Sequence, residues 1–336
     1  MAAAEDYENW VLPSEKRDHP EKEGVFGTEE FLSAFRAEYG FGFPEFIEIV
    51  GCLMDFCLDK DTVVTSQTRD EIVKLCEGRP VNPEDIDAFL NSFSLKARNS
   101  WAPQSPVKPS DVEPWRFERK LSVILRPLIE CKNLDETTYV FGVGTMREAF
   151  AYIIDSISNG KFDKDVFISR SMRSYIGKRV DEAGRSFTHE VAALLRKLGW
   201  QTLEEVKMSQ LGAGKSPNLG DIDVLAWSEE GYVLAIECKR LKGARTISEI
   251  AQICSRFQGN VGDHLHKHIR RITWLDQNRL KLEKFLNIPS PNLKLFNPLV
   301  TNNIVPFKYM KDLPLSTHEI IPIDSLSDYL SEITLR

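Results

Sequence analysis

The chain has 336 residues and a mass of 38.4 kDa, of which 42% are hydrophobic and 28% charged, and its formal net charge is −7. This is the composition of a folded globular protein, and it excludes a collagen-like, mucin-like or wholly disordered chain. No segment reaches the roughly 20 consecutive apolar residues of a membrane span, and the acidic N-terminus lacks the apolar core of a secretory signal.

The first part of the chain is predicted to be mainly helical. Residues 1–27 are polar and charged without a sustained apolar period, and we expect a flexible arm there. Apolar residues then recur at three- and four-residue steps, which predicts helices over 28–39, 44–58, 68–77 and 83–93. These segments predict a mainly helical N-terminal domain over residues 28–110, which ends in a proline-rich segment at 102–114.

Residues 111–185 are predicted to connect two domains. The segments LSVILRPLIEC (121–131) and TYVFGVG (138–144) are rich in β-branched and other apolar residues, and the turn-like KNLDE lies between them. This pattern predicts a hairpin. Helical patterns follow at about 145–158 and 168–198.

Residues 186–336 are predicted to form an α/β domain. After the helix that ends near residue 198, the period becomes strand-like. Strands are expected over 201–210, 221–227, 232–239, 299–309 and 319–323. Helices are expected over 246–258 and 263–287, with a short final helix after Asp324.

Two of these expected strands carry charged side chains at their ends. The strand over 221–227 begins with Asp221 and Asp223, and the strand over 232–239 ends with Glu237 and Lys239. Since successive side chains of a strand point to opposite faces, each pair shares one face of its strand. Charged groups that end otherwise apolar strands are costly unless they serve a function.

The loop between the two strands predicts their register. A three-residue loop that ends at Gly231 would put this glycine in the left-handed position that such loops favour. Asp223 then faces Glu237, and Asp221 faces Lys239. Facing Cβ atoms are about 4.5–5.5 Å apart, so two carboxylates can share a cation. Because the ligands are oxygens, Mg²⁺ or Mn²⁺ is favoured over zinc.

Lys239 adds a positive charge beside the two carboxylates. An ammonium group there can orient an attacking water and counter the negative charge that builds on a phosphate. Two carboxylates and a lysine on one sheet face therefore indicate phosphodiester hydrolysis. The alternative is an ordinary set of surface charges with a cross-strand salt bridge, and isolated pairs of that kind are common.

The order Glu190, Asp223 and Glu237-Cys238-Lys239 resembles the PD-(D/E)xK, or restriction-endonuclease-like, nuclease superfamily. The resemblance implies an α/β fold whose central mixed sheet is flanked by helices, in the order helix, three antiparallel strands, helix and further strand. It also implies that Asp223, Glu237 and the carbonyl of Cys238 bind the metal ion. By the same resemblance Lys239 is the catalytic lysine, and Glu190 is the acidic residue of the first core helix.

The sequence departs from the superfamily pattern in two places. Ile222, and not proline, precedes Asp223. Two aspartates also compete for one role, and we favour Asp223 because it begins the apolar run and faces Glu237. Asp221 is expected to bind a second metal ion or to tune the site. Glu190 is also consistent with a solvated glutamate at the edge of an apolar helix stripe.

The charge distribution favours a nucleic-acid partner for the second half of the chain. Residues 1–60 have a net charge of −9, whereas residues 239–284 have a net charge of +7. The basic residues that follow the site are expected to contact a nucleic-acid backbone, although solvated helix faces are the alternative. They are Arg240, Lys242, Arg245, Arg256, Lys267, Arg270 and Arg271. His264, His266 and His268 lack further zinc ligands and are interpreted as phosphate contacts or surface histidines.

Together these features predict a Mg²⁺- or Mn²⁺-dependent nuclease, and by the resemblance an endonuclease that acts in bacterial defence or DNA repair. Double-stranded DNA is the favoured substrate over RNA, because the sequence most resembles the restriction-enzyme and nuclease-related branches of the superfamily, which mostly cut DNA. The alternative is a non-catalytic nucleic-acid- or protein-binding module on a nuclease-like fold. The acidic N-terminal half is expected to regulate, to dock a protein partner or to contribute to assembly, homo-oligomers included. The six cysteines show no C-x-x-C spacing, which favours reduced thiols and a cytoplasmic location.

Overall fold

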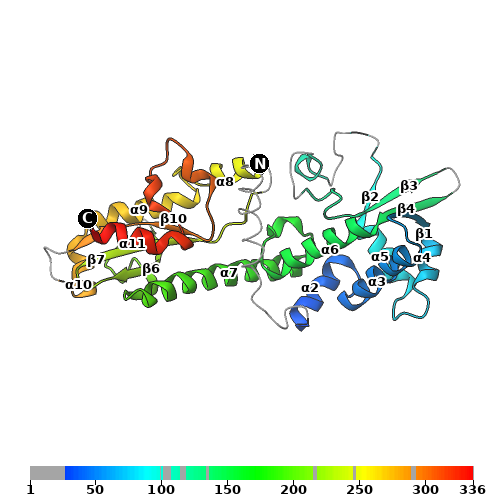
Figure 1. The fold of residues 1–336 in the computed structure, drawn as a ribbon, viewed down its shortest axis with the longest axis horizontal. Helices are drawn as coiled ribbons and strands as arrows, with labels where there is room; N and C mark the ends of the chain where they lie inside the picture. Colours follow the sequence, from blue (N-terminus) through cyan, green and yellow to red (C-terminus); the bar gives the residue numbers. More distant parts are fainter. Residues whose placement is uncertain are drawn as a thin grey trace. The chain divides into compact units, whose positions relative to one another are not determined.

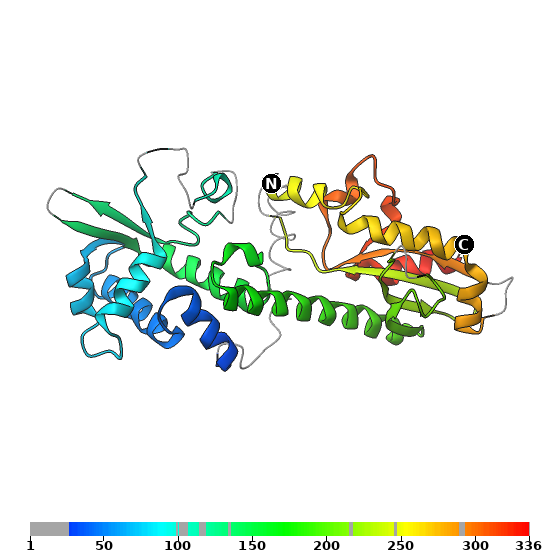
Figure 2. The same ribbon diagram turned by 180° about the vertical axis from the view of Figure 1, so that it is seen from behind.

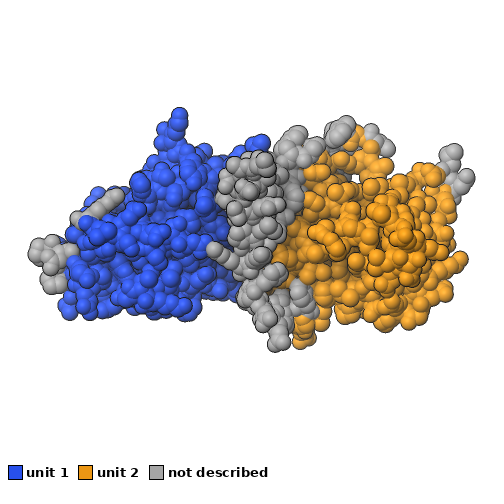
Figure 3. Space-filling model, viewed as in Figure 1, with its two compact units in different colours: residues 1–17, 182–336 blue, residues 18–181 orange. Residues whose placement is uncertain are grey.

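The computed structural model describes residues 27–98, 100, 107–113, 119–133, 136–214, 218–244, 247–288 and 293–335. The predicted arm, except its last residue, and Arg245 lie outside this part of the chain. The described residues form two compact units, one over residues 27–181 and the other over residues 182–335 (Figures 1 and 3). Both units combine helices with a sheet, so the protein has the predicted α/β class. Within the described residues, none of the helices has the length and apolar character needed to cross a membrane.

The N-terminal unit packs five helices against a four-stranded sheet. The helices are α2 (Glu29–Tyr39), α3 (Phe43–Asp59), α4 (Arg69–Leu75), α5 (Pro83–Phe93) and α6 (Val143–Ser158). The strands are β1 (Val64–Thr68), β2 (Ser94–Lys96), β3 (Leu128–Lys132) and β4 (Thr137–Gly142), in the order β1-β4-β3-β2. The core is rich in phenylalanine, and rings from α2, α3, α5 and α6 contact one another there.

The predicted helices of this unit are confirmed within a few residues, but β1 and β2 were not predicted. Both strands are short, and they pair with β4 and β3, which lie beyond the proline-rich segment. The sheet therefore joins the segment predicted as a helical domain to the segment predicted as a connection, and both belong to one compact unit. The predicted hairpin forms between β3 and β4, with residues 121–127 outside the strand.

Helix α7 (Arg170–Lys197) supplies side chains to both cores. Its first half contributes Tyr175 and Ile176 to the core of the N-terminal unit. Its second half contributes Val191 and Leu195 to the core of the C-terminal unit. The predicted tract at 168–198 corresponds to this single helix.

The C-terminal unit contains a six-stranded mixed sheet. The strands are β5 (Gln201–Lys207), β6 (Asp221–Trp227), β7 (Tyr232–Lys239), β8 (Lys294–Phe296), β9 (Leu299–Thr301) and β10 (Ile320–Pro322). β5, β6 and β7 are antiparallel neighbours, whereas β9 and β10 continue the sheet from β7 in parallel. β8 also pairs with β7 in parallel, so β7 is the central strand.

Helices cover this sheet on both faces (Figure 2). They are α7, α8 (Ile247–Ser255), α9 (His264–Gln277), α10 (Arg279–Leu286) and α11 (Leu326–Leu335). One apolar cluster joins α7 and α11 to the sheet, and a second joins α9 and α10 to it. The helix predicted over 263–287 is divided at Asn278. The strand predicted over 299–309 ends at Thr301, and a 3₁₀ turn occupies Pro306–Tyr309.

The hairpin of β6 and β7 has the predicted register. Gly231 has φ of 90°, the left-handed conformation expected at the end of the loop. The N–H of Ser228 donates to the carbonyl of Tyr232 at 2.9 Å, and Val224 pairs with Ile236. Hydrogen-bonded pairs recur at every second residue of an antiparallel ladder, so even-numbered residues of β7 direct their backbone groups toward β6.

Candidate functional site

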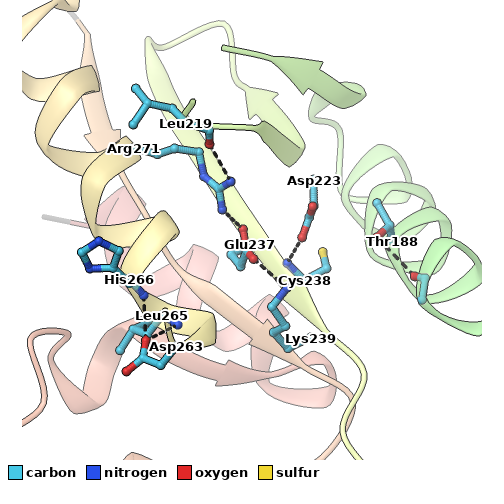
Figure 4. A network of polar contacts seen from close by, with 11 residues as sticks. Thr188, Leu219, Asp223, Glu237, Cys238, Lys239, Asp263, Leu265, His266 and Arg271 are labelled. Atoms are coloured by element: carbon cyan, nitrogen blue, oxygen red, sulfur yellow. Dashed lines mark hydrogen bonds and ion pairs between the residues drawn. The ribbon is translucent and has the colours of Figure 1, made fainter. Parts of the chain in front are cut away.

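The ladder between β6 and β7 ends where the acidic side chains begin. Pairing runs along the hairpin as far as Val224 and Ile236. The next N–H of β7 that points toward β6 belongs to Cys238, and it donates to Oδ2 of Asp223 at 2.7 Å. The carboxylate of Asp223 therefore binds the backbone of β7 at the point where the two strands separate, as Figure 4 shows.

Glu237 lies next to this junction on β7 and is buried, with 5% of its surface exposed. Its Oε1 accepts a hydrogen bond from Nζ of Lys239 at 2.7 Å. Its Oε2 accepts from Nη2 of Arg271, a buried residue of α9. Nη1 of Arg271 also donates to the carbonyl of Leu219 at 3.2 Å. One guanidinium group thus joins β7 to the segment that leads into β6 (Figure 4).

The two carboxylates of the site have opposite pKa shifts. Burial, together with the negative charge of Glu237, raises the pKa of Asp223 from 3.8 to about 6. Burial also acts to raise the pKa of Glu237, but the charges of Lys239 and Arg271 outweigh it and hold the pKa of Glu237 below its ordinary value. Burial acts to lower the pKa of Lys239, but the two carboxylates raise it. Glu237 and Lys239 are therefore charged at neutral pH, whereas Asp223 changes its charge near pH 6.

This donor set suits a hard divalent cation. Asp223 and Glu237 are close enough for one charge to raise the pKa of the other carboxyl group, and a cation bound between them would remove that repulsion. The carbonyl of Cys238 points toward β6, as its N–H does, so it lies on the same side as Asp223. Among the residues that the structure describes, no three His, Cys, Asp or Glu side chains are grouped to hold a metal. A metal here would need backbone or water oxygens besides the two carboxylates.

Asp221 and Glu190 are surface residues. Asp221 is exposed, and its partner across the sheet is Lys207 of β5. Its predicted pairing with Lys239 is wrong, because the β6–β7 ladder ends before it and Lys239 contacts Glu237 instead. Glu190 is an exposed residue of α7.

Arg271 requires a correction of the predicted nucleic-acid surface. Its side chain was expected to contact a phosphate backbone, but it is buried and binds Glu237. The reason is that Arg271 lies on the face of α9 that packs on the sheet. The other predicted residues lie nearer the surface: Arg256 and Lys267 are exposed, and Arg240, Lys242 and Arg270 are half-buried.

The three histidines of α9 also differ from one another. His268 was interpreted as a phosphate contact or a surface residue, but it is buried and its Nε2 lies 3.1 Å from the carbonyl of Asn297. Burial lowers the pKa of His268 to about 4, so this side chain is neutral at pH 7. His264 is exposed and packs against Phe257, and Nδ1 of His266 lies 3.3 Å from the carbonyl of Gly259.

A strained residue lies opposite Asp223 on the neighbouring strand. Glu204 and Val206 of β5 pair with β6, and Glu205 between them has φ of 53°. A side-chain-bearing residue rarely adopts this left-handed conformation, and such strain often occurs at functional sites. Glu205 could not be singled out from the sequence, because the strand pattern continues through it without a glycine or proline.

The structure thus defines an α/β protein with a network of two carboxylates, a lysine and an arginine at the end of its central strands, in which Glu237 and Arg271 are buried. A family model described as anti-phage protein Upx-like matches residues 4–328, nearly the whole chain. The chain belongs to this family of anti-phage proteins, which indicates a role in phage defence. No curated protein and no solved structure gives a significant match.

Proposed function

We propose that this protein is a metal-dependent nuclease that acts in phage defence by hydrolysing phosphodiester bonds, with double-stranded DNA as its favoured substrate. The observation that carries the proposal is the junction at the end of the β6–β7 hairpin. There Asp223 binds the backbone of Cys238, while Glu237 and Lys239 lie beside it and contact each other. A defence role alone does not require this set of charges around a buried glutamate, whereas hydrolysis of a phosphodiester does use it.

The order of elements supports a restriction-endonuclease-like core in the C-terminal unit. Helix α7 is followed by the three antiparallel strands β5, β6 and β7, then by α8, α9 and α10, and then by β9 in parallel with β7. This is the order that the resemblance of the sequence implies. The acidic residues and the lysine lie on the second and third of these strands, as the same resemblance implies.

Each residue of the site would have its own role in hydrolysis. Asp223, Glu237 and the carbonyl of Cys238 would hold Mg²⁺ or Mn²⁺, and the bound ion would supply Lewis acidity toward a phosphate oxygen. Lys239 stays charged at neutral pH because of the two carboxylates beside it. Its ammonium group can therefore orient a water molecule and stabilise the negative charge that develops on phosphorus-bound oxygens.

A basic surface supports a nucleic-acid substrate. Arg256 and Lys267 are exposed on and beside the helices that follow β7, and residues 239–284 have a net charge of +7. Such side chains bind phosphate groups without regard to base sequence. The family assignment fits an activity directed at phage nucleic acid.

A cleavage assay with purified protein tests this proposal. Supercoiled plasmid DNA is incubated with Mg²⁺ and either the wild type, Asp223→Ala or Asp221→Ala, with EDTA in a parallel reaction. We expect nicking or linearisation by the wild type, none in EDTA, and a rate at least about a hundredfold lower for Asp223→Ala, because the metal site is lost. The Asp221→Ala control should cleave at a rate near that of the wild type.

Two results of this assay would contradict the proposal. Equal cleavage by the wild type and Asp223→Ala would remove the site assignment. No cleavage of duplex DNA, single-stranded DNA or RNA, with no metal bound, would favour a non-catalytic binding module instead. One observation favours that second candidate: both oxygens of Glu237 already have cationic partners, Lys239 and Arg271, without any metal ion.

A further inference from the structure

We infer that Arg271 is a positioning residue that acts as the internal counter-ion of Glu237 and thereby limits the metal affinity of the site. This inference rests on the proposed nuclease function and concerns the regulation of that same site. It does not follow from the superfamily resemblance, which assigns no role to Arg271. The inference rests on the contacts of Arg271 with Glu237 and with the carbonyl of Leu219.

Arg271 occupies the side of Glu237 that Lys239 leaves open. Lys239 binds Oε1 and Arg271 binds Oε2, so each carboxylate oxygen already has a charged donor. Both Glu237 and Arg271 are 5% exposed, which places their ion pair away from bulk water. Ion pairs in such surroundings are screened far less than surface pairs.

Arg271 is also held in place by a second contact. Its Nη1 donates to the carbonyl of Leu219, and Gly220 lies so close that a Cβ there would be 3.5 Å from Nη1. Because the guanidinium binds the backbone carbonyl of Leu219 and the carboxylate of Glu237 at once, it cannot leave the site without losing both hydrogen bonds. The ion pair between Arg271 and Glu237 is therefore a stable part of the metal-free site.

The consequence is a charge balance in the metal-free site. Asp223 and Glu237 contribute two negative charges, and Lys239 and Arg271 contribute two positive charges. An arriving cation meets little net negative charge and must share Glu237 with Arg271. Removal of the Arg271 charge should therefore tighten metal binding, whereas a purely structural role would make metal binding weaker.

The test is calorimetric titration of Mn²⁺ into the full chain at neutral pH and low salt. Arg271→Gln and Arg271→Met both remove the charge, and the second brings no new polar group into the buried position, while both leave Oε2 of Glu237 without its cationic partner. We expect both variants to bind Mn²⁺ about tenfold more tightly than the wild type, or tighter still, because a unit charge at this range strongly opposes a cation. Arg270→Gln, at the half-buried neighbouring position of the same helix, is the matched control and should bind like the wild type.

Circular dichroism with and without Mn²⁺ follows folding in the same samples. A variant that folds only after Mn²⁺ is added supports the inference, since the cation takes over the role of Arg271. The inference is contradicted if both charge-removing variants bind Mn²⁺ as tightly as the wild type or more weakly. It is also contradicted if both variants stay unfolded in the presence of Mn²⁺. If the Arg271 variants contradict the inference, but the wild type binds Mn²⁺ and Asp223→Ala does not, the proposed function still stands. Absence of Mn²⁺ binding in every chain, the wild type included, would instead contradict the proposed function itself.

Discussion

At the scale of single residues, Asp223 has two tasks. Its Oδ2 accepts the N–H of Cys238 and so satisfies a backbone donor where the ladder opens. The same side chain is half-buried beside Glu237, which raises its pKa to about 6. A carboxylate that is costly to ionise without a cation is the kind of group that a metal ion stabilises.

The raised pKa of Asp223 predicts a change of stability with pH in the absence of metal. Because the folded-state pKa of about 6 lies above the ordinary 3.8, the folded protein holds this proton more tightly than the unfolded chain does. The contribution of Asp223 is therefore fully present below about pH 4 and is lost as the pH rises through 6. We expect the free energy of unfolding of Asp223→Asn, measured against that of the wild type in EDTA, to rise by about 1–3 kcal/mol from pH 4 to pH 7.

Urea denaturation at several pH values measures this difference. The variant and the wild type are compared at each pH because His268 changes the stability with pH in the opposite direction. Burial lowers its pKa to about 4, so its contribution to stability is lost as the pH falls. Asp221→Asn, at an exposed position of the same strand, is the matched control for the substitution itself. A pH-independent difference for Asp223→Asn would show that this carboxyl group is not perturbed.

At the scale of elements, the hairpin of β6 and β7 builds the site. Its register is set by the loop that ends at Gly231, whose φ of 90° suits glycine. A slip of one residue would move every side chain of a strand to the other face and would take Glu237 away from Arg271 and Lys239. The loop thus determines the geometry of side chains several residues away.

Gly231→Ala tests this dependence on the loop. Alanine is strained at this φ, so we expect the free energy of unfolding to fall by about 1 kcal/mol. Gly243→Ala is the control, because Gly243 has no positive φ and a Cβ there would meet open space. Chemical denaturation of both variants at neutral pH measures the effect, and equal stability of the two would argue against a requirement for glycine in the loop.

The same elements show what the sequence could reveal. The strands over 221–227 and 232–239 were predicted with the bounds that the structure has, because apolar runs, charged ends and Gly231 all mark them. That register also predicted that Asp223 and Glu237 lie next to each other. The role of Arg271 could not be predicted, because α9 brings it to a residue 34 positions away and the local pattern shows only a charge on a helix. Likewise β1 and β8 are too short to show a period, and their partners lie far along the chain.

At the scale of the whole molecule, the family match extends over both compact units. The role in phage defence therefore belongs to the chain as a whole, while the proposed chemistry lies in the C-terminal unit. The N-terminal unit has its own phenylalanine-rich core and its own sheet, so it can fold around contacts that do not involve the proposed site.

We propose that this anti-phage protein hydrolyses phosphodiester bonds, with Lys239 as the residue that assists attack at phosphorus. We would measure the initial rate of plasmid DNA cleavage at saturating Mn²⁺ for the wild type, Lys239→Met and Lys197→Met. The last variant removes an exposed lysine at the end of α7, outside the network and outside the basic segment 239–284. We predict a rate at least about a hundredfold lower for Lys239→Met, because charge stabilisation in the transition state is lost, and a rate within a few-fold of the wild type for Lys197→Met. Cleavage by Lys239→Met at the wild-type rate would contradict this account.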